Sequence, residues 1–487
     1  MITVREIDPA DDSSFDSWYA VLRAGATADR EVPLLASHDA LATSLRVPVP
    51  TKALVAVAAY DGERVVGAMI FEYGLKDNLD SALVEINVAP ADRRQGIGTA
   101  LWGWARARAA SLGRTVYQTE IAIPAGFTTD TWPACLFATK LGFALEHIED
   151  HLVVPLPYQH QIELEPLVGY ELISWAGPCP EEFLPVYAEL RTAMSADVPS
   201  GGMTRETRHW QVDELRQLEE RNAKNYLSLV VLARALDGTP AGYTVMFLPK
   251  TDPETAQQLD TLVLRDHRGH NLGAHLKLAN LEQLAKHRTT QKLLHTWTAE
   301  TNTAMQKVNA RFGFVAREKN AEYEVTLPEP RLRQAVRAVV LDAEDRVLLL
   351  RFEFDDKVVW AAPGGGVEAG ESLREGLVRE LSEEIGLEPP ADAPHLWHQV
   401  AVSPDYAGGY DGVINDYFLI RVDSFTPAGV LSQAELEAES VYGHRWWTLE
   451  ELQSHEGPAY LSPRTLHHQL AHLVQHGPPP EPLFLGV

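Results

Sequence analysis

Hydrophobic residues in the first two thirds of the chain form paired runs around short polar turns. AAYDGERVVGAMIFEY around Gly67 and ARALDGTPAGYTVMFLP around Gly242 each read as two apolar strands joined at an Asp-Gly turn, which is typical of a β-hairpin. A short strand, a basic turn that contains glycine, and a helix follow in both places, in ALVEINVAPADRRQGIGTAL and in QLDTLVLRDHRGHNLGAHL. The pattern therefore predicts the same order of elements twice.

The two copies keep a constant distance along the chain. A spacing of 175 residues separates Gly67 from Gly242, Glu85 from Asp260, and Arg93 from Arg268. The copies also end alike, in KLGF and RFGF, with 171 residues between Gly142 and Gly313. So regular an offset indicates one fold duplicated in tandem.

Proline-rich stretches mark the ends of the two copies. VVPLPYQ and TLPEPRL each follow an apolar run and precede a new one, where few contacts should cross between domains. They divide the 487 residues into segments 1–157, 158–329 and 330–487, in keeping with about 150 residues per domain. Strands and helices occur in all three segments, so we expect an α/β (α+β) protein.

The third segment contains a helix with an apolar stripe and an acidic face. Its apolar residues recur every four positions, and Gly386 stands where a helix C-cap glycine is favoured. The stripe consists of Leu373, Leu377, Leu381 and Ile385. On the polar side, Glu380 and Glu384 share a face, with Glu383 beside them. Carboxylates so close repel one another, and their oxygen atoms suit Mg²⁺, with Mn²⁺ as a substitute.

A longer motif surrounds this helix. From Gly365 the order is Gly, five residues, Glu371, seven residues, Arg-Glu-Leu, one residue, Glu-Glu, one residue, Gly-Leu. It matches the Nudix box at every defined position, and the segment is identified as a member of the Nudix hydrolases, which implies an α/β/α sandwich and Mg²⁺-dependent hydrolysis of a nucleoside diphosphate-linked compound. The resemblance implies metal ligands at Gly365, Glu380, Glu383 and Glu384, and catalytic roles for Arg379, as an orienting group, and for Glu383. Which glutamate is the base is left open.

The basic turns of the two copies suit an anion. Glycines let the backbone approach a phosphate closely, and the free amides of the following helix point toward it. A tight turn without a ligand explains one such turn equally well. The tandem arrangement, however, resembles the GNAT acetyltransferases, whose signature of Arg or Gln, two residues, Gly, one residue, and Gly or Ala is met by Arg93, Gly96 and Gly98. In the second copy Asn271 replaces the first glycine, and Asn tolerates the left-handed backbone region better than most residues.

The GNAT resemblance implies acetyl-CoA as cofactor, with its pyrophosphate on these turns and its pantetheine arm along the preceding strands. In the first copy the implied cofactor-binding residues are Ile86, Val88, Arg93, Arg94, Gln95, Gly96, Ile97, Gly98 and Thr99. In the second copy they are Val263, Arg268, Gly269, His270, Asn271, Leu272, Gly273 and Asn302.

Acetyl transfer to an amine requires a group that removes the amine proton. Glu85 and Asp260 lie eight residues before the signature arginines, where many GNAT enzymes have a carboxylate base, and they are the candidates. A strand carboxylate that faces solvent is an equally good interpretation of each. The tyrosine that many GNAT enzymes use to protonate the leaving thiolate is replaced by Ala138 and Asn309, so we expect at least one copy to be inactive or regulatory.

The charge and hydropathy of the chain limit the classes of partner that we expect. The net charge of −26 disfavours nucleic acid as the main partner. No run approaches the ~20 apolar residues of a membrane helix, and the start of the chain lacks a signal peptide, so we expect a cytoplasmic protein without a membrane partner. The oligomeric state stays open.

Two hypotheses about function follow. In the first, the protein is a bifunctional enzyme that acetylates a small amine and hydrolyses a nucleoside diphosphate-linked compound. In the second, the duplicated fold only binds acyl-CoA, as a regulatory or scaffolding unit for the Nudix hydrolase.

Overall fold

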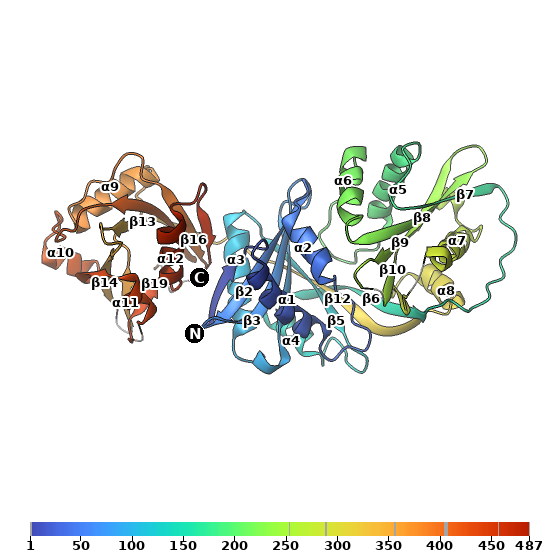
Figure 1. Cartoon of the computed structure of the whole chain (residues 1–487), viewed down its shortest axis with the longest axis horizontal. Helices are drawn as coiled ribbons and strands as arrows, with labels where there is room; N and C mark the ends of the chain where they lie inside the picture. Colours follow the sequence, from blue (N-terminus) through green and yellow to red (C-terminus); the bar gives the residue numbers. More distant parts are fainter. Residues whose placement is uncertain are drawn as a thin grey trace.

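The computed structural model of the chain describes residues 2–252, 254–287, 290–354, 357–403, 408–455 and 457–486. Three bodies follow one another in Figure 1, with the first repeat lying between the second repeat and the C-terminal segment. No helix in these described ranges is long and apolar enough to cross a membrane.

The two repeats have the same order of elements, as the sequence predicts. The first consists of β1 (Ile2–Glu6), α1 (Asp12–Thr27), α2 (His38–Arg46), β2 (Lys52–Asp61), β3 (Arg64–Gly74), β4 (Ser81–Val88), α3 (Ile97–Ser111), β5 (Val116–Ile123), α4 (Pro133–Lys140) and β6 (Ala144–Pro155). The second consists of β7 (Tyr170–Ala176), α5 (Leu184–Asp197), α6 (Val212–Asn222), β8 (Tyr226–Ala235), β9 (Pro240–Pro249), β10 (Thr255–Val263), α7 (Leu272–His287), β11 (Leu293–Ala299), α8 (Thr303–Arg311) and β12 (Val315–Thr326).

The repeats exchange their last strands. One twelve-stranded sheet runs in the order β1-β2-β3-β4-β5-β12-β6-β11-β10-β9-β8-β7. Strand β12 of the second repeat therefore pairs with β5 of the first, while β6 of the first pairs with β11 of the second. The exchange joins the two repeats through backbone hydrogen bonds at the centre of the sheet (Figure 1).

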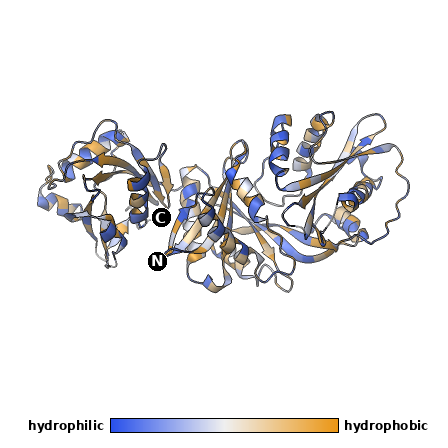
Figure 2. Ribbon diagram, in the orientation of Figure 1, coloured by the Kyte–Doolittle hydropathy of each residue, from blue (hydrophilic) through white to orange (hydrophobic). Residues whose placement is uncertain are grey.

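Helices cover both faces of this sheet. In the first repeat, α1 and α2 pack on one face, whereas α3 and α4 pack on the other. In the second repeat, α5 and α6 pack on the face that corresponds to that of α1 and α2, and α7 and α8 pack on the opposite face. Strands buried on both faces read as continuous apolar runs, as in β2, where Ala56, Val57, Ala58 and Ala59 are all buried (Figure 2).

The C-terminal segment forms a separate sheet between helices. An eight-stranded sheet has the order β19-β15-β14-β13-β17-β16-β20, with β18 beside β14. Helix α9 packs on one face, and α11 and α12 pack on the other, which gives the expected α/β/α arrangement. Its elements are β13 (Leu332–Leu341), β14 (Val347–Phe354), β15 (Lys357–Ala361), α9 (Leu373–Glu384), β16 (His395–Ala401), β17 (Gly412–Arg421), α10 (Gln433–Ala438), β18 (Val441–Trp447), α11 (Leu449–Gln453), β19 (Tyr460–Ser462), α12 (Leu466–His476) and β20 (Leu483–Leu485).

Helix α9 begins and ends where local chemistry dictates. Ser372 accepts from the Glu375 amide while the Glu375 carboxylate accepts from the Ser372 amide, which forms a capping box. Gly386, with φ 70°, follows the end of the helix. Both ends of the acidic helix are thereby fixed.

Candidate active sites

The glycine turns of the two repeats have the same backbone. Arg94 (φ 68°) and Gly96 (φ 84°) lie in the left-handed region between β4 and α3. Their counterparts Gly269 (φ 88°) and Asn271 (φ 53°) do so between β10 and α7, so Asn271 does adopt the conformation that the glycine would have. The N-cap Gly96 gives α3 no side-chain cap, and neither α3 nor α7 has an acidic residue in its first turn. The first amides of α3 are therefore available to an anion.

The predicted cofactor-binding residues around these turns differ in which of their atoms are free to contact a cofactor. The signature arginines Arg93 and Arg268 donate from Nε to the carbonyl oxygens of Val88 (3.3 Å) and Val263 (3.0 Å), so those carbonyls are already engaged. Ile97 and Leu272 are buried in the cores, which leaves only their backbone for a cofactor. Asn302 caps α8, since its side chain accepts from the Met305 amide. Contact of these residues with acetyl-CoA stays a prediction.

The substitution Gly96→Ala tests whether the first turn requires a left-handed backbone at this position. A Cβ at Gly96 would meet no atom within 4 Å, so the expected cost of about 1–2 kcal/mol comes from the left-handed backbone alone. Urea unfolding should show this loss, and calorimetry should show weaker binding of acetyl-CoA. The matched control is Gly103→Ala inside α3, which also meets no atom within 4 Å and should stabilise the helix by about 0.5–1 kcal/mol. Equal shifts for both variants would contradict this reading of the turn.

The two candidate bases lie in unlike surroundings. In β4, burial and, to a smaller extent, the charges of Glu120 and Glu72 raise the pKa of Glu85 to about 7, against the charge of Lys52, which lowers it. In β10, the Tyr243 hydroxyl donates to Asp260 Oδ2 at 2.7 Å, and Arg191 Nε lies 3.8 Å from the same oxygen. Asp260 also lies where the β9–β10 register shifts. Asp260 is therefore already engaged by its neighbours, whereas Glu85 has no such side-chain hydrogen bond among the described contacts.

Three carboxylates that were not predicted as site residues lie on the next three strands of the sheet beyond Glu85. Glu120 on β5 is opposite Glu322 on β12, and Glu149 lies on β6, the next strand. Burial is the main cause that raises the pKa of each, to about 7 for Glu149. We call Glu85, Glu120, Glu149 and Glu322 the carboxylate floor.

Neither position of the missing tyrosine carries another phenol. Ala138 is buried in the core of the first repeat. Asn309 is buried in the second, where it accepts from Lys277 Nζ at 2.8 Å and donates to Thr298 Oγ1 at 2.7 Å. Burial lowers the pKa of Lys277 to about 7. The second repeat thus fills this position with a closed polar network.

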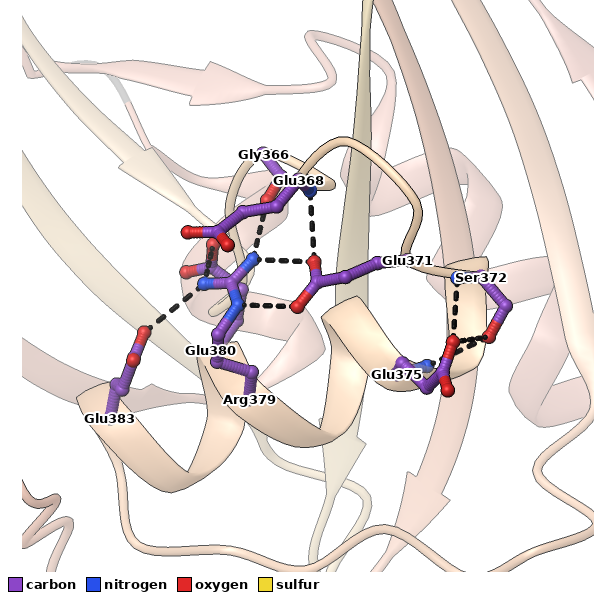
Figure 3. Close-up of polar contacts among 8 residues, drawn as sticks. All are labelled: Gly366, Glu368, Glu371, Ser372, Glu375, Arg379, Glu380 and Glu383. Atoms are coloured by element: carbon purple, nitrogen blue, oxygen red, sulfur yellow. Dashed lines mark hydrogen bonds and ion pairs between the residues drawn. The ribbon is translucent and has the colours of Figure 1, made fainter.

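In the C-terminal segment, Arg379 connects the acidic helix to the loop before it (Figure 3). Its guanidinium donates to both carboxylate oxygens of Glu371 (2.9 and 3.0 Å) and to the Gly366 carbonyl (2.7 Å). Nη1 also donates to Glu380 (2.8 Å) and Glu383 (3.2 Å). These contacts fit the orienting role that the sequence predicts for Arg379.

Glu380 and Glu384 form the buried part of this site. Burial raises the pKa of Glu384 to about 8 and also raises that of Glu380. The Gly364 amide donates to Glu384 at 2.6 Å. A Cβ on Gly365 would lie 2.5 Å from a Glu380 oxygen, so a side chain at this position would displace the Glu380 carboxylate. Two desolvated acids one helical turn apart, with oxygen donors only, suit a divalent cation.

The three glutamates do not already converge on one point. Among the described residues, no three His, Cys, Asp or Glu side chains form a group ready for a metal ion. Arg379 holds Glu383, and the Gly364 amide holds Glu384. Arg337, which the sequence groups with Arg331 and Arg333 in a small basic cluster expected at the surface, donates to the Gly364 carbonyl and lowers the pKa of Glu384 against the effect of burial.

Comparisons with known proteins agree with these two kinds of site. Residues 188–314 match the Acetyltransferase (GNAT) family model, and residues 331–469 match the NUDIX domain model. An RNA pyrophosphohydrolase of Campylobacter jejuni subsp. doylei is 35% identical over 108 residues, which cover 19% of this chain and 65% of that protein. An RNA pyrophosphohydrolase of Nitratiruptor sp. is 33% identical over 111 residues, with 20% and 67% covered.

A solved structure resembles the duplicated part. The tandem GNAT protein from the clavulanic acid biosynthesis pathway is similar with a TM-score of 0.56 and 29% identity, over 67% of this chain and 98% of that protein. The chain spans 65% of the length of the Campylobacter jejuni enzyme, so that similarity concerns part of each protein.

Proposed function

Because the chain belongs to the GNAT acetyltransferases through its repeats and to the Nudix hydrolases through its C-terminal segment, we propose that it is a bifunctional enzyme. One reaction transfers the acetyl group of acetyl-CoA to a small amine, and the other hydrolyses a nucleoside diphosphate-linked compound with Mg²⁺. The observation that carries the proposal is that each domain type has a carboxyl group whose pKa burial raises, Glu85 in the first repeat and Glu384 in the C-terminal segment.

In the transfer reaction, the first repeat is the working copy. Acetyl-CoA supplies the activated acetyl group, and the amides that follow Gly96 hold its pyrophosphate. Glu85 takes up the proton of the amine as its nitrogen attacks the thioester carbon, a task suited to a carboxylate with a pKa of about 7. The C–S bond then breaks, and CoA leaves as a thiolate that takes its proton from solvent. Asp260 is bonded to Tyr243 and close to Arg191, so the second repeat has no equally free base.

In the hydrolysis, Glu380, Glu383 and Glu384 would hold a divalent cation together with the Gly365 carbonyl. The bound cation supplies positive charge to the phosphate oxygens and lowers the pKa of water. Arg379 keeps Glu380 and Glu383 in position, and one of the glutamates removes the proton of the attacking water. Glu383 and Glu384 are both candidates for that base.

Chelation should separate the two reactions. With EDTA present, release of nucleotide from a panel of nucleoside diphosphate sugars should fall to the background rate and return when Mg²⁺ is added in excess. Acetylation of an amine panel, followed by thiol release, should continue at an unchanged rate, since no metal takes part in it. Loss of both activities in EDTA would overturn this assignment.

RNA with a 5′ pyrophosphate is a second substrate class for the hydrolase, because two of the similar proteins are named RNA pyrophosphohydrolases. The net charge of −26 opposes a long polyanion. Direct comparison of kcat/KM for a 5′-triphosphorylated oligonucleotide and for the nucleotide panel decides between the classes, and we expect the nucleotides to be preferred.

In the alternative function, the duplicated fold serves as a binding unit alone. The closed network at Asn309 and the engaged Asp260 favour that role for the second repeat. If the protein binds acetyl-CoA tightly but acetylates no amine, both repeats are binding units.

A further inference from the structure

The carboxylate floor crosses from one repeat to the other on a single face of the sheet. On β4, β5 and β12, the residues beside the floor acids, such as Val84, Ile121 and Ala321, face the core under α3. Since side chains alternate along a strand, Glu85, Glu120 and Glu322 face the opposite side, where α1 and α2 lie. The exchanged strand β12 lies between β5 and β6, so Glu322 comes from the second repeat and the other three acids from the first (Figure 1).

Among the described residues, fewer basic side chains than acids contact the carboxylate floor. Arg205 donates to Glu322 at 2.9 Å, and Lys52 binds the nearby Glu72 at 2.7 Å. The neighbouring Glu318 on β12 is an acid whose burial is compensated by basic partners. Although burial alone would raise its pKa, hydrogen bonds from His151 and Arg30 lower this pKa to about 2. Glu120 and Glu149 have no such partner guanidinium among their described hydrogen bonds, and the pKa of each is raised, by burial and by the acids around it.

A buried imidazole next to the floor also lacks a partner. His147 on β6 is 8% exposed, and its Nε2 has no hydrogen-bond partner among the described residues. Nε2 lies 3.9 Å from Glu149 Oε1, beyond hydrogen-bond distance, and His147 is opposite Glu322 in the strand register. Burial and the charge of Arg205 lower its pKa, so the ring is neutral at pH 7 and can accept an N–H.

We propose that the acceptor of the first repeat is an aliphatic amine with at least two positive charges. One amino group lies at Glu85 and is acetylated, while a second ammonium group lies among Glu120, Glu149 and Glu322, and one of its three N–H groups donates to His147 Nε2. Such a ligand supplies positive charge to acids for which the described side chains provide too few cations, and charge-assisted hydrogen bonds to carboxylates are the strong ones. This inference rests on the proposed function of the first repeat as a transferase.

Matched amines test the charge requirement with the full chain and acetyl-CoA. We expect kcat/KM for 1,4-diaminobutane to exceed that for butylamine about 100-fold or more, which corresponds to two charge-assisted contacts of moderate strength. Glu149→Gln and Glu322→Gln should each raise KM for the diamine about tenfold with little change in kcat, and should leave butylamine unaffected. Arg205→Gln should lower KM for the diamine, because it removes a competing cation. The control is Glu182→Gln, an exposed acid before α5 of the second repeat.

Calorimetry separates this inference from the proposed function. Titration of 1,4-diaminobutane into the full chain with CoA measures binding without turnover. Binding that Glu149→Gln and Glu322→Gln weaken, without acetylation of any amine, would overturn the transferase assignment and support the cation site. Equal acetylation of butylamine and the diamine, with no effect of either variant, would overturn the cation site and leave the transferase in place. Thermal unfolding of each variant identifies any that fails to fold, and Arg205→Gln then provides the independent readout.

Discussion

Replacing Glu384 by glutamine is expected to lower the hydrolysis of nucleoside diphosphate sugars about 10³-fold, or about 4 kcal/mol in transition-state stabilisation. Glutamine keeps the size of the side chain and can still accept from the Gly364 amide, but it removes the charge that a divalent cation needs. Steady-state kinetics of nucleotide release at saturating Mg²⁺ measures the loss. Acetyl transfer by the same preparation should be unchanged.

The matched control for Glu384→Gln is Glu388→Gln, an exposed acid four residues beyond α9, which should retain full hydrolysis. Thermal unfolding should show that Glu384→Gln folds at least as stably as the parent at pH 7. A carboxyl group whose pKa is raised from 4.5 to about 8 on folding loses stability as the pH rises through that interval, and glutamine avoids this cost. Retention of hydrolysis by Glu384→Gln would remove this glutamate from the catalytic machinery.

Replacing Glu85 by glutamine is expected to lower kcat for amine acetylation about 10²- to 10³-fold, the range of a lost general base. The pKa of about 7 predicts the pH dependence of the parent. Below pH 7 the carboxyl is protonated and cannot accept a proton, so kcat should fall about tenfold per pH unit. Above pH 7 it should level off. The glutamine variant should lack this acidic limb, and its measurement at saturating amine distinguishes catalysis from binding.

Asp260→Asn is the counterpart of this variant in the second repeat. Because Tyr243 and Arg191 already engage Asp260, we expect its loss to change kcat less than threefold, on the order of ordinary neutral effects. An acidic limb that persists in Glu85→Gln and disappears in Asp260→Asn would move the reaction to the second repeat.

The parts of the molecule that could be predicted from sequence are those that local contacts determine. The four-residue spacing of leucines, the Ser372 capping box and Gly386 are sufficient to define helix α9. The constant offset between Arg93 and Arg268 predicts two turns with one backbone, and Asn271 adopts its left-handed conformation as expected. Each of these features depends on residues fewer than fifteen positions apart or on direct repetition.

The strand exchange could not be predicted in this way. An apolar strand such as β6 satisfies its hydrogen bonds and buries its side chains equally well beside either repeat. Its partner β11 begins at Leu293, far along the chain from Ala144, where β6 begins. Sequence patterns register which face of a strand is buried, but not which strand lies beside it.

The carboxylate floor was missed for the same reason. A single acid in an alternating strand looks like a solvent-facing residue, although Glu322 is in fact buried. These acids converge only because β12 enters the first repeat beside β5. The contacts of Asp260 with Arg191 and Tyr243 could not be predicted from the sequence either, since Arg191 comes from α5 and Tyr243 from β9. The signal that could have found the floor is the recurrence of glutamate on strands otherwise rich in buried side chains.

A crossed assay of three preparations tests the central claim most directly. The parent, Glu85→Gln and Glu384→Gln are each assayed for acetylation and for diphosphate hydrolysis under one set of conditions. The account predicts that the parent has both activities, that Glu85→Gln loses only acetylation, and that Glu384→Gln loses only hydrolysis. A parent without either activity, or a single substitution that abolishes both in a folded protein, would contradict it.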